Sequence, residues 1–332
     1  MENNLKLLLE NLQSALPEGT TLNQALIKEL KINKDAASRR VSGKTPFTYD
    51  EVCALSKAYS INLLPAQSSQ FSNVVFGYAP FKARGIDSKH FFQNISNLLR
   101  EANKHEHKLL YHVAPEVPVY HYYNYPKLLN FKLFYWGKYL LNIPHYTKST
   151  FDQIEIDQEI TKHAKVAYKN YCTIPSVEIW TPQTLQTVLT QLHFCVETGD
   201  FPSKEGVEGV LAEVDMMMKR IKQMAEENNK AFDLEEKLQI PFQFYKIDVN
   251  INTTSILFEI DNQKTVLQPF NSINFMNTTQ TDFCEENLHW IQNIQSKSSL
   301  LSGAGIVERQ KYFSSVNKQI NEFKESLNRR EF

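Results

Sequence analysis

The chain has few cysteines, and it lacks the short motifs by which several classes of enzyme are recognised. Its 332 residues include only four cysteines, none in a Cys-x-x-Cys pair, which indicates reduced thiols in a cytoplasmic protein. No HExxH, GxSxG or GxGxxG motif is present, and no spacing places a nucleophile beside a base. His105 and His107 would diverge on a helix and do not predict a metal site. We therefore expect a protein that is not an enzyme, with no metal and no cofactor.

A long apolar run and a strong net charge are also missing. The most apolar stretch, residues 128–143, is interrupted by Lys132, Gly137 and Lys138, so it falls short of the roughly 20 apolar residues that a membrane span requires. Residues 1–15 carry acids and no cleavage-like end, so we expect no signal peptide. The net charge of −1 excludes a uniformly basic nucleic-acid coat. We expect a cytoplasmic protein with no membrane partner.

Positive charge is instead concentrated in one short region. Six lysines and arginines lie between Lys28 and Lys44, against only Glu29 and Asp35 of opposite sign. A local basic cluster of this kind is the electrostatic footprint that contacts to DNA phosphates need. The cluster lies within residues 20–64, where apolar residues recur at helical spacing in three short segments joined by tight connections.

The middle segment predicts a helix from Lys34 to about Ser42 with an unusually polar composition. Asn33 is placed to cap its N-terminus, and Gly43 is placed to end it. Its apolar residues form only a thin seam, made by Ala36, Ala37 and Val41. A polar helix that another helix clamps through a short turn is what a DNA-reading helix-turn-helix requires.

This stretch resembles the lambda-repressor-like helix-turn-helix family, and among its members the regulators of Bacteroidetes-type bacteria. The resemblance rests on the turn LKIN at residues 30–33, the SxxxSG end of the second helix at residues 38–43 and the third helix, ExxALSKAYSI, at residues 51–61. Lys31 stands where the family usually has a turn glycine. The resemblance implies a helical bundle that binds double-stranded DNA through the second helix and the turn after it. The expected DNA-binding residues are Asn33, Lys34, Asp35, Ser38, Arg39, Arg40, Ser42, Lys44 and Thr45.

The expected roles of these side chains differ. Arg39 and Arg40 can each pair bidentately with a guanine or hold a phosphate, but each can equally be a charge on a solvated helix face. Lys34 and Lys44 are expected to touch phosphate, and Ser38 either reaches a base or faces solvent. The alternative for the whole bundle is a protein-binding or dimerising module.

The rest of the chain predicts a larger helical domain, so the expected fold class is mainly α, or α+β overall. Apolar residues at alternate positions after Pro241 predict a small antiparallel sheet over about residues 242–276. We divide the chain into a DNA-binding domain at residues 1–66, a linker at residues 67–86 and a C-terminal sensing and oligomerisation domain at residues 87–332. The last also resembles the uncharacterised C-terminal part of Bacteroidetes-type helix-turn-helix proteins, notably in IPSVEIW and SLLSGAGIVERQKYF, but this resemblance implies no activity.

Two patterns in the larger domain each have two interpretations. The heptad seam within residues 205–238 fits a helix of an intramolecular bundle or a dimeric coiled coil. The dense aromatic residues at 120–139 fit a packed core or the lining of a ligand pocket.

The sequence as a whole predicts a transcriptional regulator that binds double-stranded DNA as a homodimer, since a single bundle buries too few base contacts for useful specificity. The C-terminal domain is expected to sense an unknown effector, which acts only if it binds the DNA-competent state differently from the incompetent one. Two alternatives stay open. One is a defence or signalling protein whose C-terminal domain is the effector, and the other is a protein-interaction scaffold.

Overall fold

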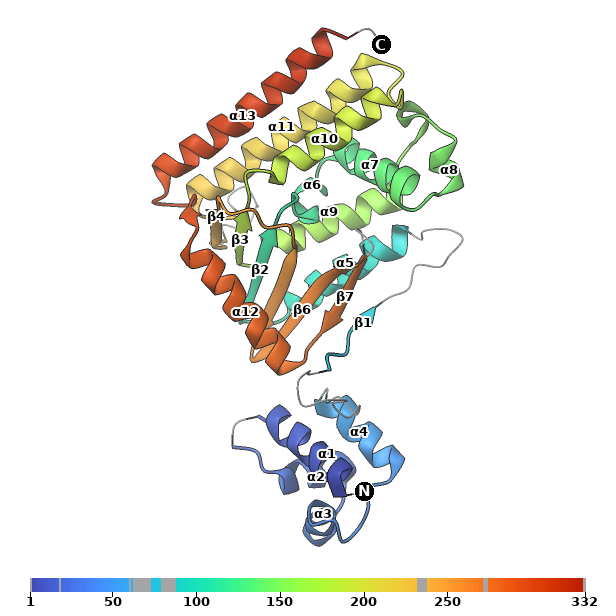
Figure 1. The fold of residues 1–332 in the computed structure, drawn as a ribbon, viewed down its shortest axis with the longest axis vertical. Helices are drawn as coiled ribbons and strands as arrows, with labels where there is room; N and C mark the ends of the chain where they lie inside the picture. Colours follow the sequence, from blue (N-terminus) through green and yellow to red (C-terminus); the bar gives the residue numbers. More distant parts are fainter. Residues whose placement is uncertain are drawn as a thin grey trace. The chain divides into compact units, whose positions relative to one another are not determined.

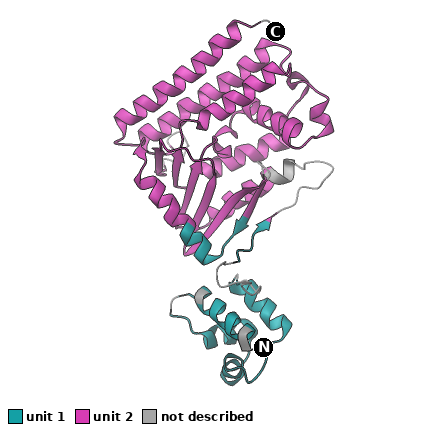
Figure 2. Cartoon of the chain, viewed as in Figure 1, with its two compact units in different colours: residues 1–77, 277–286 teal, residues 78–276, 287–332 magenta. Residues whose placement is uncertain are grey.

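The chain is described here in a computed structural model that covers residues 2–17, 19–59, 61, 73–78, 88–231, 238–270 and 274–330. It divides into two compact units (Figure 2): a smaller one of residues 1–77 and 277–286, and a larger one of residues 78–276 and 287–332. The architecture is α+β, with helices predominating around one mixed sheet (Figure 1). Of the expected linker, residues 67–86, only residues 73–78 are described, and they end in the short strand β1 (Gly77–Tyr78).

The smaller unit contains a bundle of four helices, which we call the head. These are α1 (Glu2–Ala15), α2 (Leu22–Leu30), α3 (Lys34–Val41) and α4 (Tyr49–Tyr59). Each of the four contributes at least one apolar side chain to a common core, which is made of Leu12, Leu26, Ala37, Leu55 and Ile61. This core is small, so the capping and the connections between the helices matter for the order of the head.

The larger unit is built on a sheet with the strand order β1-β7-β6-β5-β2-β3-β4-β8. The remaining strands are β2 (Lys108–Ala114), β3 (Ser176–Trp180), β4 (Phe242–Lys246), β5 (Ser255–Ile260), β6 (Gln263–Phe270), β7 (Asn274–Thr278) and β8 (Ser299–Leu300). Strands β2, β3 and β4 run parallel, whereas β5 pairs with β2, β6 with β5 and β8 with β4 in antiparallel register.

The prediction of a small antiparallel sheet over about residues 242–276 was right only in part, because β5 and β6 pair in antiparallel register but β4 runs parallel to β3. The strands β4 to β7 do fall in that range, but they extend a sheet whose centre is formed by β2 and β3 from far earlier in the chain. The five residues of β3 are all buried, as is typical of a parallel strand inside a sheet. Such a strand shows no alternation, and its pairing with β2 is invisible to a local pattern.

Helices fill the long connections between the parallel strands. Between β2 and β3 lie α6 (Val119–Tyr122), α7 (Pro126–Tyr135), a π-helix (Trp136–Leu140), α8 (Pro144–Thr147), a 3₁₀ turn (Phe151–Gln153) and α9 (Gln158–Cys172). Between β3 and β4 lie α10 (Thr184–Glu197) and α11 (Lys204–Glu227). The unit also contains α5 (Ser88–Ala102), α13 (Ile306–Asn328) and residues 287–296 of α12 (Thr281–Ser296). Figure 1 shows α10, α11 and α13 side by side as one helical layer.

The structure decides both ambiguous patterns of the larger unit. The heptad seam of α11 is buried within the chain, where α11 packs against α7 and α13, so it belongs to an intramolecular bundle. The aromatic residues of α6 and α7 are core residues as well: Tyr120, Tyr122, Tyr123, Phe131 and Phe134 are all buried. Large rings packed edge to face, such as Phe92 against Tyr123 at 5.3 Å, give this core its rigidity.

Candidate nucleic-acid interface

The connection between α2 and α3 is three residues long and is fixed at both ends. Lys31 ends α2 in the left-handed conformation, with φ of 53° and ψ of 40°. Asn33 is extended and caps α3, because its side-chain oxygen accepts the backbone N–H of Ala36 at 2.8 Å. The expected capping role of Asn33 is thus confirmed, and the cap determines where α3 begins.

Helix α3 buries one narrow side and leaves the other open to solvent. Ala37 is fully buried in the core of the head, and Val41 packs against that core. The exposed residues of the helix are Lys34, Asp35, Ser38 and Arg39. This is the composition of a helix that is held from behind and presents polar side chains outward.

Arg40 lies differently from Arg39. Its guanidinium donates to Glu51 on α4 twice, from Nε to Oε2 at 3.0 Å and from Nη2 to Oε1 at 2.6 Å, and its Nη1 donates to the Ala36 carbonyl at 3.3 Å. The Arg40 side chain is only 14% exposed. The hydrogen bonds from Arg40 lower the pKa of Glu51. The structure therefore assigns Arg40 to a clamp between α3 and α4 rather than to an outward contact.

The residues after α3 form a closed turn. The Ser42 hydroxyl donates to the Arg39 carbonyl at 3.2 Å, and the backbone N–H of Thr45 donates to the same carbonyl at 3.1 Å. Gly43 has a φ of 74°, which favours glycine, and a Cβ there would lie 3.0 Å from Leu5. Ser42 and Thr45 thus shape the turn, whereas the Lys44 side chain is exposed.

The cations of the head fall into two groups. Three are paired with acids: Lys6 with Glu10, Lys28 with Glu29, and Arg40 with Glu51. Within the described residues, five cations of the head make no ion pair: Lys31, Lys34, Arg39, Lys44 and Lys57. The first four are exposed on α3 or on the connections that flank it, and Lys57 is exposed on α4. Exposed cations without an acidic partner are available to an anionic ligand such as a DNA phosphate.

Two exposed residues near α3 are not among the DNA-binding residues expected from the sequence. Tyr49, the first residue of α4, is 81% exposed, and Lys31 carries an unpaired charge in the turn. Only Lys31 had a signal in the sequence, since it lies within the basic cluster between Lys28 and Lys44. Tyr49 had none, because an exposed aromatic residue at the start of a helix looks the same as a core residue.

The larger unit contains a buried polar cluster around Glu178 of β3. The Glu178 carboxylate accepts hydrogen bonds from Trp180 Nε1 at 3.1 Å and from the Tyr171 hydroxyl, and His121 Nε2 lies 2.9 Å from the carboxylate oxygen Oε2. Burial acts to raise the pKa of Glu178, but the charge and hydrogen bond of His121 hold it at about 2. His112 faces Glu178 across the β2–β3 pairing, and burial lowers its pKa to about 4.

Lys230, in the turn after α11, completes this buried Glu178 cluster. Its ammonium donates to the Ile174 carbonyl at 2.7 Å and lies 3.3 Å from the centre of the Tyr171 ring. Burial lowers the pKa of Lys230 to about 7, although the charge of Glu178 opposes the shift. His121, Glu178 and Lys230 are at most 2% exposed, so a substrate does not reach the cluster in this conformation.

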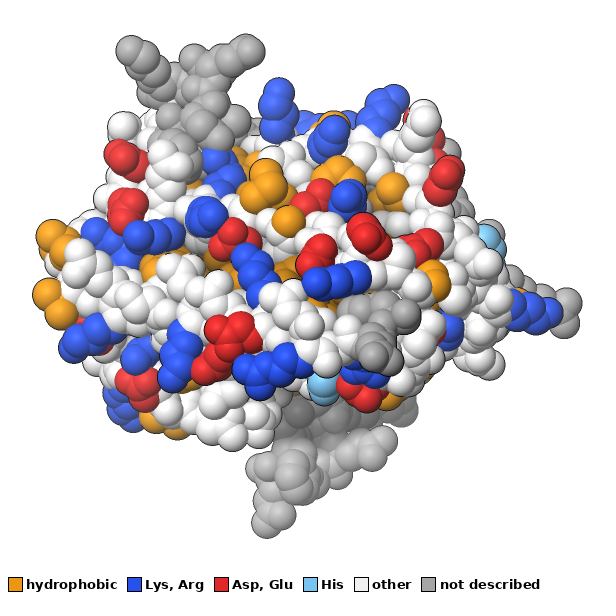
Figure 3. All heavy atoms as spheres, turned by 90° about the horizontal axis from the view of Figure 1, so that it is seen from above, with side chains coloured by type: hydrophobic (Ala, Val, Ile, Leu, Met, Phe, Trp, Pro, Cys, Tyr) orange, Lys and Arg blue, Asp and Glu red, His pale blue; other side chains and the backbone are white. Residues whose placement is uncertain are grey.

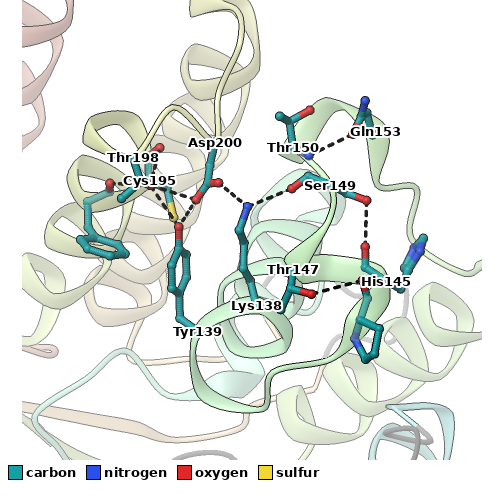
Figure 4. A network of polar contacts seen from close by, with 12 residues as sticks. Lys138, Tyr139, His145, Thr147, Ser149, Thr150, Gln153, Cys195, Thr198 and Asp200 are labelled. Atoms are coloured by element: carbon teal, nitrogen blue, oxygen red, sulfur yellow. Dashed lines mark hydrogen bonds and ion pairs between the residues drawn. The ribbon is translucent and has the colours of Figure 1, made fainter.

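A second polar network braces the π-helix (Figure 4). Lys138 Nζ lies 2.5 Å from Asp200 Oδ1 and donates to the Ser149 carbonyl at 2.9 Å, while the Tyr139 hydroxyl donates to Asp200. The Thr198 hydroxyl donates to the same carboxylate at 3.0 Å. Because the charges of Lys138 and Asp200 satisfy each other, this network joins the π-helix to the residues that follow α8 and α10.

The charges of the larger unit show no basic patch on the face seen in Figure 3. Lys and Arg side chains there alternate with Asp and Glu. On the helical layer this mixing takes the form of ion pairs within α11 and α13, such as Lys219 with Asp215 at 2.8 Å and Lys311 with Glu308 at 2.7 Å. This face lacks the single-sign field that attracts nucleic acid.

Neither metal sites nor membrane spans emerge from the part of the chain that the structure describes. No group of three or more His, Cys, Asp or Glu side chains there is arranged to hold a metal ion. His105 lies 2.7 Å from Asp261, not beside a second histidine. None of the described helices combines the length and apolarity needed to cross a bilayer.

Comparison with known proteins does not add a family. No protein-family model, no curated protein and no solved structure matches this chain. The geometry of the head is therefore the feature of this chain that bears most directly on its function.

Proposed function

We propose that this protein is a sequence-specific DNA-binding transcriptional regulator whose head places α3 in the major groove. The observation that carries the proposal is that α3 is fixed on one side by packing and hydrogen bonds and is exposed to solvent on the other. Ala37 and the Arg40–Glu51 clamp hold α3 from behind, while Lys34, Ser38 and Arg39 are exposed. A helix-turn-helix needs this division, because the reading helix must be rigid and its outward side chains must be free.

Within this proposal the side chains have separate tasks. Arg39 and Ser38 lie on the exposed side and reach base edges, while Lys34 and Lys44, at the two ends of α3, contact the phosphates that flank the groove. Arg40 acts indirectly, by fixing the orientation of α3 against α4. The exposed cations favour an anionic partner, and the phosphates of DNA are the partner that this proposal assigns to them.

The larger unit would sense an effector and form the dimer. A homodimer presents two copies of α3, which read two half-sites about one helical turn, or roughly 34 Å, apart. An effector would change DNA affinity only through a different affinity for the two arrangements of the dimer. We place neither catalysis nor a cofactor in this unit, and we propose a cytoplasmic location.

The proposal predicts that Arg39 is needed for sequence selection. Full-length protein is used to select sites from a library of random-sequence duplex DNA, and the enriched sites are sequenced. The wild type should enrich a palindrome, and Arg39→Ala should lose about 10- to 100-fold in affinity for it, as expected for one bidentate base contact. Lys57→Ala, which removes an exposed cation of α4 outside the proposed interface, is the matched control and should change the affinity by about twofold or less. Failure of the wild type to enrich any site would overturn the proposal.

A further inference from the structure

We infer that Lys31 is an additional phosphate-binding residue of the head, and that its charge is retained at a conformational position where glycine would be more stable. The inference rests on the proposed DNA-binding function. It adds to the interface a residue of the turn, outside the nine side chains that sequence analysis assigns to DNA.

The first observation is the backbone conformation of Lys31. Eight described residues have a positive φ, and seven of them are residue types that tolerate it. These seven are Gly19, Gly43, Gly199, Gly303, Asn142, Asn228 and Asp261. Glycine has no Cβ to clash, and short Asn and Asp side chains can bond locally, whereas a lysine has neither advantage. At φ of 53°, Lys31 is therefore an exception among the described residues with a positive φ.

The second observation is that the Lys31 side chain forms no polar contact that would stabilise the described part of the fold. It is exposed, and it makes no hydrogen bond and no ion pair with any described residue. Lys6 and Lys28 differ from Lys31, because each forms an ion pair, Lys6 with Glu10 and Lys28 with Glu29. A residue that strains the backbone and gains no contact within the chain is one whose side chain acts outside it.

The third observation is the place of Lys31 next to the proposed reading helix. It ends α2, it is two residues from the Asn33 cap, and it is three residues from Lys34 at the start of α3. Side chains around the start of a reading helix lie over the rim of the major groove, where the phosphates are. A lysine there adds a point charge on a long flexible stem, which reaches a phosphate without a fixed backbone approach.

Three variants of the full-length chain separate charge from conformation. Lys31→Gly removes both the charge and the strain, Lys31→Ala removes the charge and keeps the strain, and Lys31→Arg keeps both. DNA affinity is measured on a mixed-sequence duplex of about 20 base pairs across a salt series, because a phosphate contact does not depend on sequence. The stability of the head is measured in the same samples by hydrogen exchange of the backbone amides of α2 and α3.

For Lys31→Gly, DNA affinity is expected to fall while the stability of the head is expected to rise. Lys31→Gly and Lys31→Ala should each lose about 5- to 8-fold in affinity at 0.1 M salt, and each should reduce the slope of log affinity against log salt by about 0.9. Lys31→Gly alone should slow the exchange of protected head amides, by about threefold, because the left-handed turn is relaxed. Lys31→Arg should match the wild type in affinity and salt slope.

Failure of this inference can be told apart from failure of the proposed function. If the wild type binds DNA with a steep salt dependence and the glycine and alanine variants keep its slope, Lys31 makes no phosphate contact and the inference is wrong while the function stands. If the wild type shows no salt-dependent binding at all, both are wrong. If Lys31→Gly exchanges faster than the wild type, the lysine stabilises the turn and the inference is also overturned.

Discussion

Replacing Glu178 by alanine is expected to destabilise the larger unit by about 3–5 kcal/mol, because one substitution leaves several buried groups without a partner. Trp180 Nε1, the Tyr171 hydroxyl and His121 all lose their common acceptor, and none is exposed to water that would replace it. Lys230 would also lose the negative charge that favours its protonated form. Urea unfolding measures the effect through tryptophan fluorescence, since all three tryptophans belong to the larger unit.

The matched control for Glu178→Ala is Glu226→Ala on α11. Glu226 is 44% exposed and lies 3.6 Å from Lys222, one turn earlier on the helix, so its removal should cost about 0–0.5 kcal/mol. The contribution of Glu178 depends on pH in a defined way: its pKa of about 2 lies below the ordinary 4.5, so this stability is present above pH 4.5 and is lost as the pH falls through 2. A cost below about 1 kcal/mol for Glu178→Ala would show that the buried Glu178 cluster contributes little to the stability of the larger unit.

Lys230→Met should abolish a rise in stability at alkaline pH. The pKa of Lys230 is about 7 in the folded chain and 10.5 ordinarily, so the unfolded chain binds more protons between these values. The free energy of unfolding therefore increases with pH across that window, and Lys230 removes stability below pH 7. Replacement by methionine should reduce the difference in unfolding free energy between pH 9 and pH 7 by about 2 kcal/mol.

The measurement for Lys230→Met is the same unfolding experiment repeated at a series of pH values. Lys222→Met serves as the control, since Lys222 is 42% exposed on α11 and should leave the pH dependence unchanged. If Lys230→Met keeps the slope of the wild type, Lys230 is charged in the folded protein at neutral pH and its burial must be compensated by other groups.

The sequence was most informative about helix ends in the head, because capping is a local property. Asn33 caps α3 as expected. A second local cap is the capping box at Thr48, whose hydroxyl accepts the Glu51 N–H at 3.3 Å while Glu51 accepts the Thr48 N–H at 3.0 Å. These features depend on residues within one turn of each other, so they can be inferred without knowledge of the fold.

Features that depend on distant residues could not be inferred in the same way. The division of labour between Arg39 and Arg40 is set by Glu51, 11 residues from Arg40 and on another helix. The buried Glu178 cluster joins β3 to α6, α9 and the turn after α11, and no spacing in the sequence connects His121 with Glu178 or Lys230. The parallel pairing of β2 with β3 was missed for the same reason, since 66 residues separate Leu110 from its partner Ser176.

The sequence shows which residues are charged, but it does not show whether a charge is paired with an acid inside the protein or is open to a ligand. The six cations between Lys28 and Lys44 look equivalent in the printed sequence. In the structure Lys28 and Arg40 are paired with acids, whereas the other four are exposed and make no ion pair with a described residue. The proposed interface follows from this difference, and it is more restricted than the sequence alone indicates.

The most direct test of the central proposal is photo-crosslinking from the exposed side of α3. A benzophenone-bearing amino acid is placed at Ser38 in one full-length sample and at Lys57 on α4 in another, since both side chains are exposed in the head. Each sample is irradiated with duplex DNA that the wild-type protein has enriched. The account predicts cross-links to bases from residue 38 and none from residue 57. Cross-linking from residue 57 but not from residue 38, or from neither, would contradict the assignment of α3 as the DNA-reading helix.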